Sequence, residues 1–378
     1  MRLQHYKYLD GFRGIAALWV MIGHILIIYD INLRVLSWVS LPVDLFMLVS
    51  GFLMVRHAIA RETAEPLDRP LSWATFWLRR FFRIAPLYYF LLLFSIIYQQ
   101  SERGFDGAFH YHTWDGLNES YDQFVAHLLS HVSFVFGLSP VFSRSTSMPD
   151  WSLSLEMQFY ALFPFLMLLG RRTGWITLAI GVAGVCLAAE LIFPSFLHEF
   201  TLPSILILKL NIFMGGMLVA LALDNRGQSA SYIAVAVALM ILPLWGGENF
   251  KAGIARALLC AGFATAALCD RYSRTAGMPA HITLIPAILG ARPFAIMADL
   301  SYGVYLMHFF VIFAWARLTA PEALLAPLSG AAGALIAVPA ASYALAWVAR
   351  QTVELRGIEF GRQVIQRFRM LSAPAPPK

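Results

Sequence analysis

An arginine and a histidine lie eleven residues apart in the first apolar run of this chain, residues 8–28 (YLDGFRGIAALWVMIGHILII). Eleven residues are close to three α-helical turns, so Arg13 and His24 would project from nearly the same face, roughly 16 Å apart along the axis. The run also holds Asp10. Because an ionisable group in a membrane helix is costly, the default interpretation is a functional site facing the protein interior. A histidine that is only hydrogen-bonded between helices is the structural alternative.

Two carboxylates are predicted to lie near the depth of His24. If the first run enters from the inside, His24 lies roughly 20 Å up, in the outer half of a ~30 Å hydrocarbon core. Asp44 (VDLFMLVSGFL) and Glu156 (WSLSLEMQFY) lie in the first turns of runs that would descend from the outside. A histidine oriented by a carboxylate is the arrangement of a general base. A structural polar network between three helices is the alternative. Ser152, Glu156 and Tyr160 share one helical face.

A group of arginines could bind phosphate at the opposite end. Arg79, Arg80 and Arg83 (LRRFFRIAP) enter the third apolar run, and Arg13 lies below His24 in the first. Guanidinium groups bind phosphate bidentately, so a long, thin ligand such as acyl-coenzyme A (acyl-CoA) could anchor its phosphates here and direct its reactive end toward His24. Simple positive-inside anchoring is the alternative, and for Arg79 it is the favoured one.

A further apolar run presents Ser301, Tyr305 and His308 on one face (LSYGVYLMHFF). These side chains could line the same tunnel, with His308 nearer the inner half of the membrane. For His308, a hydrogen bond that joins two helices is an equally good interpretation.

The composition defines the elements that must position these residues. Hydrophobic residues make up 59% of the 378 residues and charged residues 13%, against ~25% in soluble domains. The mean hydropathy is +0.66. We therefore expect an all-α polytopic membrane protein with one transmembrane domain, residues 1–370, and a disordered tail, residues 371–378. Three unpatterned cysteines indicate neither disulfides nor a zinc site, and the first run lacks a signal-peptide cleavage site.

About ten transmembrane helices are predicted from the apolar runs. Their limits are residues 10–30, 38–58, 82–99, 151–169, 174–193, 203–223, 230–245, 252–269, 300–319 and 328–349. The basic loops all fall on one side, so both termini are predicted to be cytoplasmic. The net charge of +6 is clustered beside these runs, so it indicates topology and no nucleic-acid partner.

The longest external segment, residues 100–150, is acidic and is expected to contact the acceptor. Residues 123–138 are apolar but short, which favours an interfacial or re-entrant piece. His127 and His131 share a helical face there, with His110 and His112 upstream. We expect no metal, because no acidic or cysteine ligand has a matching spacing.

Five blocks in this order resemble the bacterial membrane acyltransferase family 3. They are YLDGFRGIAALWVMIGH, DLFMLVSGFLM, RRFFRIAPLY, WSLSLEMQFYALFP and LSYGVYLMHF, spread over residues 8–310. The resemblance implies transfer of an acyl group, usually acetyl, from a cytosolic acyl donor to a carbohydrate or glycolipid. It also implies a multi-pass protein of the bacterial cytoplasmic (inner) membrane. Larger family members carry a fused periplasmic hydrolase-like domain, which we do not expect here because the chain ends soon after the tenth run.

The family's suspected catalytic element, Arg-x10-His, corresponds to Arg13 and His24. Its Arg-x-x-Arg element corresponds to Arg80 and Arg83, and the acidic residue of its Trp-Ser-Leu-Ser block to Glu156. Many members have a second acidic residue after this one, where the chain has Met157.

These features lead us to expect an O-acyltransferase without a bound cofactor, in which acyl-CoA is a substrate. His24 would be the general base, or would carry the acyl group transiently. A transporter of a small anion or acylated glycan is the main rival, since intramembrane charges also fit a transport pathway. A structural scaffold is the third. The acceptor, the acyl length and the oligomeric state, including a homo-oligomer, stay open.

Overall fold

The computed structural model describes residues 6–102, 121–244, 249–273, 279–319 and 327–372, and these form helices and connecting segments without a β-strand. The α-helices are α1 Lys7–Ile28, α2 Ser40–Arg61, α3 Pro70–Glu102, α4 Tyr121–Val132, α5 Trp151–Thr173, α6 Trp175–Ile192, α7 Pro194–His198, α8 Leu210–Ala222, α9 Ser229–Met240, α10 Phe250–Ser273, α11 Ala280–Leu289, α12 Arg292–Thr319, α14 Pro327–Ala349 and α15 Leu355–Ser372. Short 3-10 turns η1 Phe136–Leu138, η2 Phe142–Arg144 and η3 Leu206–Leu208 connect them, and a π-turn η4 Arg350–Glu354 precedes α15.

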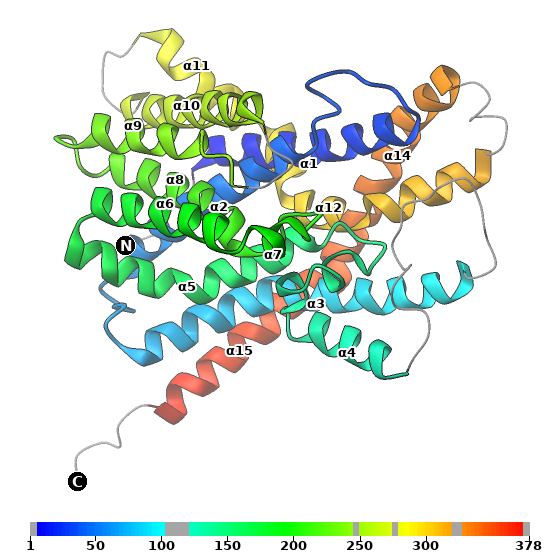
Figure 1. The fold of residues 1–378 in the computed structure, drawn as a ribbon, viewed down its shortest axis with the longest axis horizontal. Coiled ribbons are helices and arrows are strands. Elements are labelled where there is room, and N and C mark those ends of the chain that lie inside the picture. The colour runs from blue at the N-terminus through cyan, green and yellow to red at the C-terminus, as the bar shows by residue number, and fades with distance from the viewer. Residues whose placement is uncertain (1–5, 103–120, 245–248, 274–278, 320–326, 373–378) are drawn as a thin grey trace.

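Within these ranges, eight helical stretches are long and apolar enough to cross a membrane, and α8 and α9 are shorter apolar helices. Together they occupy the ten predicted positions, which confirms the all-α polytopic class. The long helices run roughly side by side along the horizontal axis of Figure 1. Residues 123–138, where an interfacial or re-entrant piece is expected, lie in α4, η1 and the segment between them.

Helix α1 packs between α2 and α12 in the middle of the bundle. Its approach to α12 is close, because a Cβ atom on Gly14 would lie 2.8 Å from the Cβ of Met297. Small residues allow membrane helices to approach in this way. Such close packing matters in a bilayer because the hydrophobic effect does not drive helices together there. The first apolar run is therefore surrounded by protein, as its polar residues require.

Helix α15 was not predicted. The tenth span continues through η4 into α15, which lies across α3. Gly357 and Gly361 make this contact possible: added Cβ atoms would lie 2.3 Å from Pro86 Cγ and 2.4 Å from Phe82 Cβ. The predicted boundary at residue 370 falls inside α15, which ends at Ser372, and the predicted tail from 373 onward lies outside the described residues.

Several helix ends meet at one end of the bundle through ion pairs. Glu65, just after α2, accepts hydrogen bonds from Arg79 of α3 and Arg369 of α15. Glu62 accepts a bond of 2.8 Å from Arg171 at the end of α5. The start of α1 and the end of α15 both lie at this end, on the left of Figure 1. The positive-inside rule predicts that this end faces the cytoplasm.

Glu65 makes the stability of this end pH-dependent. Burial favours its neutral form, but hydrogen bonds and charge attraction from Arg79, then Arg61 and Arg369, outweigh burial and lower the pKa of Glu65. Its stabilising contribution is therefore complete above the ordinary glutamate pKa of about 4.3 and is lost as the pH falls through the lower folded-state pKa.

We predict that Glu65→Gln lowers the melting temperature in detergent at pH 7, and that the difference from the native protein shrinks below about pH 4. The control is Glu359→Gln, which removes a largely exposed i,i+3 pair with Arg362 and should change little. A difference that stayed constant down to pH 3 would contradict the assignment.

Candidate functional site

Two cavities lie inside the bundle. The first, here called the arginine cavity, has a volume of about 260 Å³ and is lined by Arg13, Val43, Phe46, Met47, Val49, Ser50, Leu53, Met54, His57, Arg80, Arg83, Ile84, Ser152, Leu153, Glu156, Tyr160, Phe213, Ser301, Tyr302 and Tyr305. The second, here called the histidine cavity, has a volume of about 320 Å³ and is lined by His24, Val39, Ser40, Val43, Ser143, Arg144, Thr146, Ser147, Met148, Pro149, Trp151, Thr201, Leu202, Pro203, Tyr305, Phe309 and Phe313.

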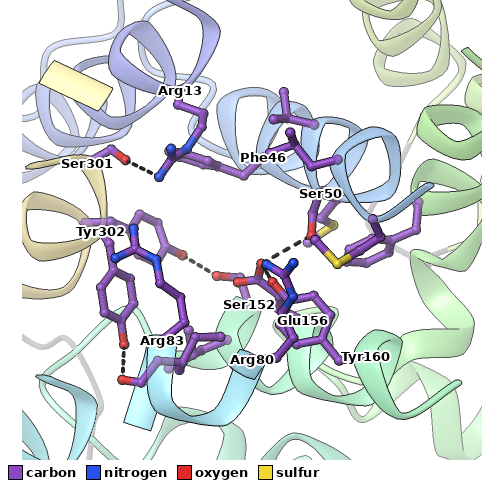
Figure 2. Close-up of a pocket in the computed structure, with 18 of the residues that line it drawn as sticks. Arg13, Phe46, Ser50, Arg80, Arg83, Ser152, Glu156, Tyr160, Ser301 and Tyr302 are labelled. Carbon is purple, nitrogen blue, oxygen red and sulfur yellow. Dashed lines mark hydrogen bonds between the residues drawn. The ribbon is translucent and has the colours of Figure 1, made fainter. Parts of the chain in front are cut away.

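Three predicted arginines line the arginine cavity, as Figure 2 shows. Arg13 donates to Ser301 Oγ over 3.3 Å. Arg80 lies 2.9 Å from His57 Nδ1, with its guanidinium over the Phe76 and Tyr160 rings. Arg83 pairs with Glu354 of the π-turn.

Arg79 does not line the cavity. It points to Glu65 at the end of the bundle, which agrees with the anchoring role favoured from the sequence. The two neighbouring arginines of LRRFFR therefore have different surroundings.

Ser152, Glu156 and Tyr160 of α5 all line the arginine cavity, as their spacing predicted. The Glu156 carboxylate accepts hydrogen bonds from Tyr160 and, over 3.2 Å, from Ser50 of α2. Glu156 is thus held among hydroxyl groups and beside arginines.

The two cavities share the lining residues Val43 and Tyr305. The Tyr305 hydroxyl lies 2.7 Å from Ser152 Oγ. This hydrogen bond joins α12 to α5 where the two cavities meet. These side chains separate the cavity that contains the arginines from the one that contains His24.

His24 is paired with a second histidine. Its Nδ1 lies 2.9 Å from His308 Nε2, and His308 Nδ1 lies 2.7 Å from the Tyr305 carbonyl oxygen. A carbonyl only accepts, so His308 carries its proton on Nδ1, and in neutral His308 Nε2 must accept. His24 Nδ1 is then the donor, which leaves His24 Nε2 as an unprotonated nitrogen. His24 lines the histidine cavity, so this nitrogen is available to a substrate there.

This pair corrects two expectations. His308 does not lie nearer the inner half of the membrane than His24: the two rings are stacked with centroids 5.1 Å apart. The structure also does not bring Asp44 or Glu156 to His24. The rise per residue gives an expected depth along a helix but not the direction in which a side chain points, so a similar expected depth does not imply contact.

Asp44 is buried against cations instead. Its carboxylate lies 3.1 Å from Lys209 Nζ and 3.9 Å from Arg256, both of which are also buried. Asp44 lines neither cavity. Its predicted role beside His24 is therefore not supported by the geometry.

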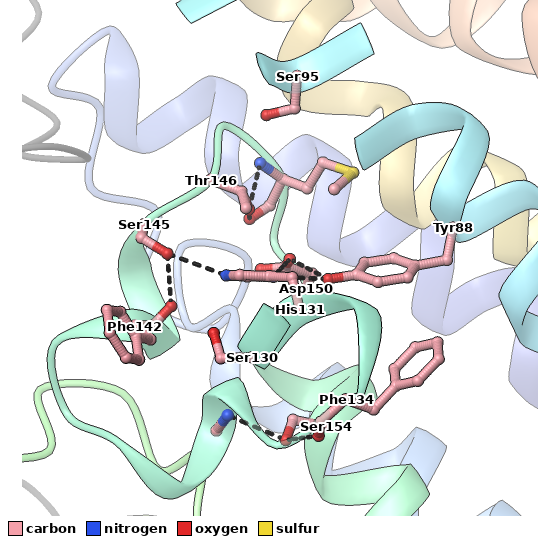
Figure 3. A network of polar contacts seen from close by, with 12 residues as sticks. Tyr88, Ser95, Ser130, His131, Phe134, Phe142, Ser145, Thr146, Asp150 and Ser154 are labelled. Atoms are coloured by element: carbon pink, nitrogen blue, oxygen red, sulfur yellow. Dashed lines mark hydrogen bonds and ion pairs between the residues drawn. The ribbon is translucent and has the colours of Figure 1, made fainter. Parts of the chain in front are cut away.

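A buried polar network lies behind one wall of the histidine cavity (Figure 3). The Tyr88 hydroxyl donates to Asp150 over 3.1 Å and lies 2.7 Å from His131 Nδ1. His131 Nε2 lies 2.9 Å from Ser145 Oγ, and Ser145 donates to the Phe142 carbonyl over 2.7 Å.

Ser145, His131 and Asp150 are the residue types of a hydrolase triad. However, the Ser145 proton is bonded to a carbonyl, the three side chains are buried, and Ser145 lines neither cavity. We conclude that this network holds residues 143–150, the wall of the histidine cavity, in place.

No group of three or more His, Cys, Asp or Glu side chains suited to a metal ion occurs among the residues with described positions. His127 and His131 are neighbours, with ring centroids 4.5 Å apart. His110 and His112 lie outside the described residues.

Ser50, His57, Arg144 and Tyr302 are among the lining residues that had no predicted role. Ser50 stands inside the DLFMLVSGFLM block and Tyr302 inside LSYGVYLMHF. Arg144 is one of two basic residues in an acidic segment, a charge contrast that could have marked it. His57 gives no signal in the sequence beyond its closeness to the second block.

The family model described as an acyltransferase domain matches residues 6–347. The chain therefore belongs to the membrane acyltransferase family 3, as its blocks indicated.

Named relatives share part of their length with this chain. It is 31% identical over 193 residues to acyltransferase MdmB of Streptomyces mycarofaciens, covering 47% of this chain and 44% of MdmB. It is 25% identical over 179 residues to the putative peptidoglycan O-acetyltransferase YrhL of Bacillus subtilis, and 29% identical over 174 residues to O-acetyltransferase OatA of Staphylococcus aureus. The matches cover 45% and 43% of this chain but 25% of each relative, so the shared part is less than half of each relative. No solved structure matches significantly.

We predict that His308 controls the reactivity of His24. In His308→Phe, His24 Nδ1 loses its acceptor, and the reaction of His24 with diethyl pyrocarbonate should slow about threefold or more, because an accepted Nδ1 proton raises the basicity of Nε2. In His308→Gln, the amide oxygen can accept in place of Nε2, so the rate should return toward the native value.

Peptide mass spectrometry gives the rate, with the exposed His198 as the internal control. Equal rates in all three proteins, or a Gln variant as slow as the Phe variant, would refute the pairing.

Proposed function

We propose that this chain is an integral-membrane O-acyltransferase that moves an acyl group, in the simplest case acetyl, from acyl-CoA to a hydroxyl group of a carbohydrate or glycolipid. The observation that carries the proposal is the pair of cavities that meet at Tyr305, one lined by three arginines and the other by His24. The setting we propose is the bacterial inner membrane, with the arginine cavity toward the cytoplasm.

The donor would bind in the arginine cavity. Its phosphates would lie against Arg80, Arg83 and Arg13, whose guanidinium groups supply paired N–H donors. Acyl-CoA is long and thin, so its thioester could extend toward the boundary at Tyr305. A shift of the Ser152–Tyr305 contact would let the thioester carbonyl reach the histidine cavity.

The acceptor would bind in the histidine cavity. There, His24 Nε2 removes the proton of the acceptor hydroxyl as its oxygen attacks the thioester carbonyl. The carbon–sulfur bond breaks, and the thiolate of coenzyme A leaves toward the arginine cavity and takes up a proton. His308 holds the His24 ring and accepts the hydrogen bond from its Nδ1–H group, the role that was predicted for a carboxylate.

The alternative sequence of steps places the acyl group on His24 first. The unprotonated Nε2 would attack the thioester carbonyl, and the carbon–sulfur bond would break to release the thiolate of coenzyme A. The acceptor hydroxyl would then attack the acyl group, the bond to Nε2 would break, and the hydroxyl proton would pass to the freed Nε2. Trapping label on the protein when acceptor is left out would favour this relay, and its absence would favour direct transfer.

We predict that His24→Ala strongly slows the chemical step. Purified protein in nanodiscs is incubated with radiolabelled acetyl-CoA and a crude envelope-glycan fraction, and thioester loss and glycan label are followed. The variant should lower kcat by about 10²-fold or more, the size of a general-base contribution.

The control is His198→Ala, which changes an exposed histidine and should leave turnover unaltered. Near-normal transfer by His24→Ala would refute the assignment. The absence of any turnover by folded native protein would favour the transporter hypothesis.

Arg80 and Arg79 offer a matched test of donor binding. We predict that Arg80→Gln raises the KM for acetyl-CoA about tenfold or more, since a hydrogen bond to a charged group contributes roughly 1.5–3 kcal/mol. The KM for acetyl-pantetheine, which lacks the phosphates, should change little.

Arg79→Gln alters the adjacent arginine, which points to Glu65 and away from the cavity, so it should leave both KM values near native. The same KM increase for both donors would show that Arg80 does not bind phosphate.

A further inference from the structure

The histidine cavity contains a cation for which the reaction so far has no use. Arg144 of η2 lines this cavity together with His24. Its guanidinium donates to the Thr201 hydroxyl over 2.7 Å. Across the described part of the chain, no carboxylate forms an ion pair with Arg144.

A guanidinium group has five N–H donors in a fixed fork. The neutral hydroxyl of Thr201 engages one of them, so most of the donor capacity of Arg144 is unused by the protein. Such a fork matches the paired oxygens of a carboxylate or phosphate.

The other residues that line the cavity fit a sugar. Trp151, Phe309 and Phe313 provide aromatic surface, and side-chain hydroxyls come from Ser40, Ser143, Thr146, Ser147 and Thr201. Sites of this kind hold a ligand on apolar surface and fix its orientation with a few polar groups. Neither Asp nor Glu is among the lining residues, so Arg144 supplies the one permanent charge on the described walls.

The position of Arg144 is fixed from behind. Its neighbour Ser145 belongs to the buried network with His131, and residues 143 and 145–150 are buried. Arg144 itself is only half-buried, which leaves its guanidinium group accessible from the cavity.

We propose that the histidine cavity is a subsite for an anionic sugar acceptor, with the carboxylate or phosphate of the acceptor on Arg144 and its reacting hydroxyl at His24. This inference rests on the proposed function for the role of His24, but the anion subsite itself is testable without turnover. A neutral sugar would leave the cation without a counter-ion in a partly desolvated cavity, where charge interactions are stronger than in water.

The test is saturation-transfer difference NMR on the full chain in nanodiscs, without acyl-CoA. Three probes are compared: methyl β-D-glucuronide, glucose 6-phosphate and methyl β-D-glucoside. We expect at least one anionic probe to bind at least tenfold more tightly than the glucoside. A preference for the glucuronide alone assigns a carboxylate and one for the phosphate alone assigns a phosphate; both outcomes support the subsite.

Three variants identify the group responsible. Arg144→Gln should remove the preference for the anion. Arg172→Gln, at the exposed end of α5, removes an arginine far from the cavity and should keep it. Thr201→Val removes the hydroxyl partner but not the charge, and should also keep it.

Equal binding of the three probes, or an unchanged preference in Arg144→Gln, overturns the proposal. If Thr201→Val loses as much of the preference for the anion as Arg144→Gln does, the proposal is also overturned. The preference would then depend on the shape of the cavity wall rather than on the charge of Arg144. Failure of the proposed function gives a different result when acetyl-CoA is added to the same samples afterwards: Arg144-dependent binding of the anion with no acetyl transfer to any probe. Transfer without a preference for the anion would instead disprove the subsite alone.

Discussion

The contact between His24 and His308 fixes how α1 lies against α12, and both cavities depend on that register. The two helices have a second polar contact about two to three turns away, from Arg13 to Ser301. Sliding one helix along the other would break both contacts at once, and polar groups left without a partner inside a membrane protein are costly. Gly14 lets the backbones approach closely enough for both contacts to form.

The same contact determines which nitrogen of His24 is free. In many enzymes a carboxylate orients the catalytic histidine, and the resulting imidazolium is stabilised by that negative charge. A neutral His308 supplies orientation but no charge. An imidazolium on His24 would therefore be less stabilised here than beside a carboxylate. We expect His24 to pass on the proton soon after taking it up. A departing thiolate in the neighbouring cavity is a suitable acceptor for it.

The sequence predicted the class of fold and the contents of the arginine cavity better than the surroundings of His24. Apolar runs give the number of helices because their length is set by the bilayer. Arg13, Arg80, Arg83 and Glu156 were found because each lies in a block of recognisable spacing. The return of α15 over α3 was missed, since a Gly-x-x-x-Gly contact gives little signal when the flanking residues are polar.

The side-chain contacts between helices could not be predicted from the sequence. The sequence predicts a depth for Asp44 and Glu156, but the rotation of each helix is decided by partners elsewhere in the chain. For Asp44 the partners are Lys209 and Arg256, which stand in segments without a family block. For Glu156 the partner on another helix is Ser50 of α2. The contact partners of a carboxylate, rather than its depth, show whether it is structural or lines a cavity.

Asp44 shows how a charge inside the membrane can serve the site without touching it. Removing one partner of a buried ion pair leaves an uncompensated charge and costs more than the pair itself contributes, so the three side chains hold their helices together. Asp44 joins α2 to Lys209 at the start of α8 and to Arg256 of α10. Its neighbour Val43 lines both cavities, and Phe213 of α8 lines the arginine cavity. The ion pairs thereby set the position of the wall at which the two cavities meet, and a carboxylate expected to orient the base instead fixes the space in which the base and the acyl group would meet.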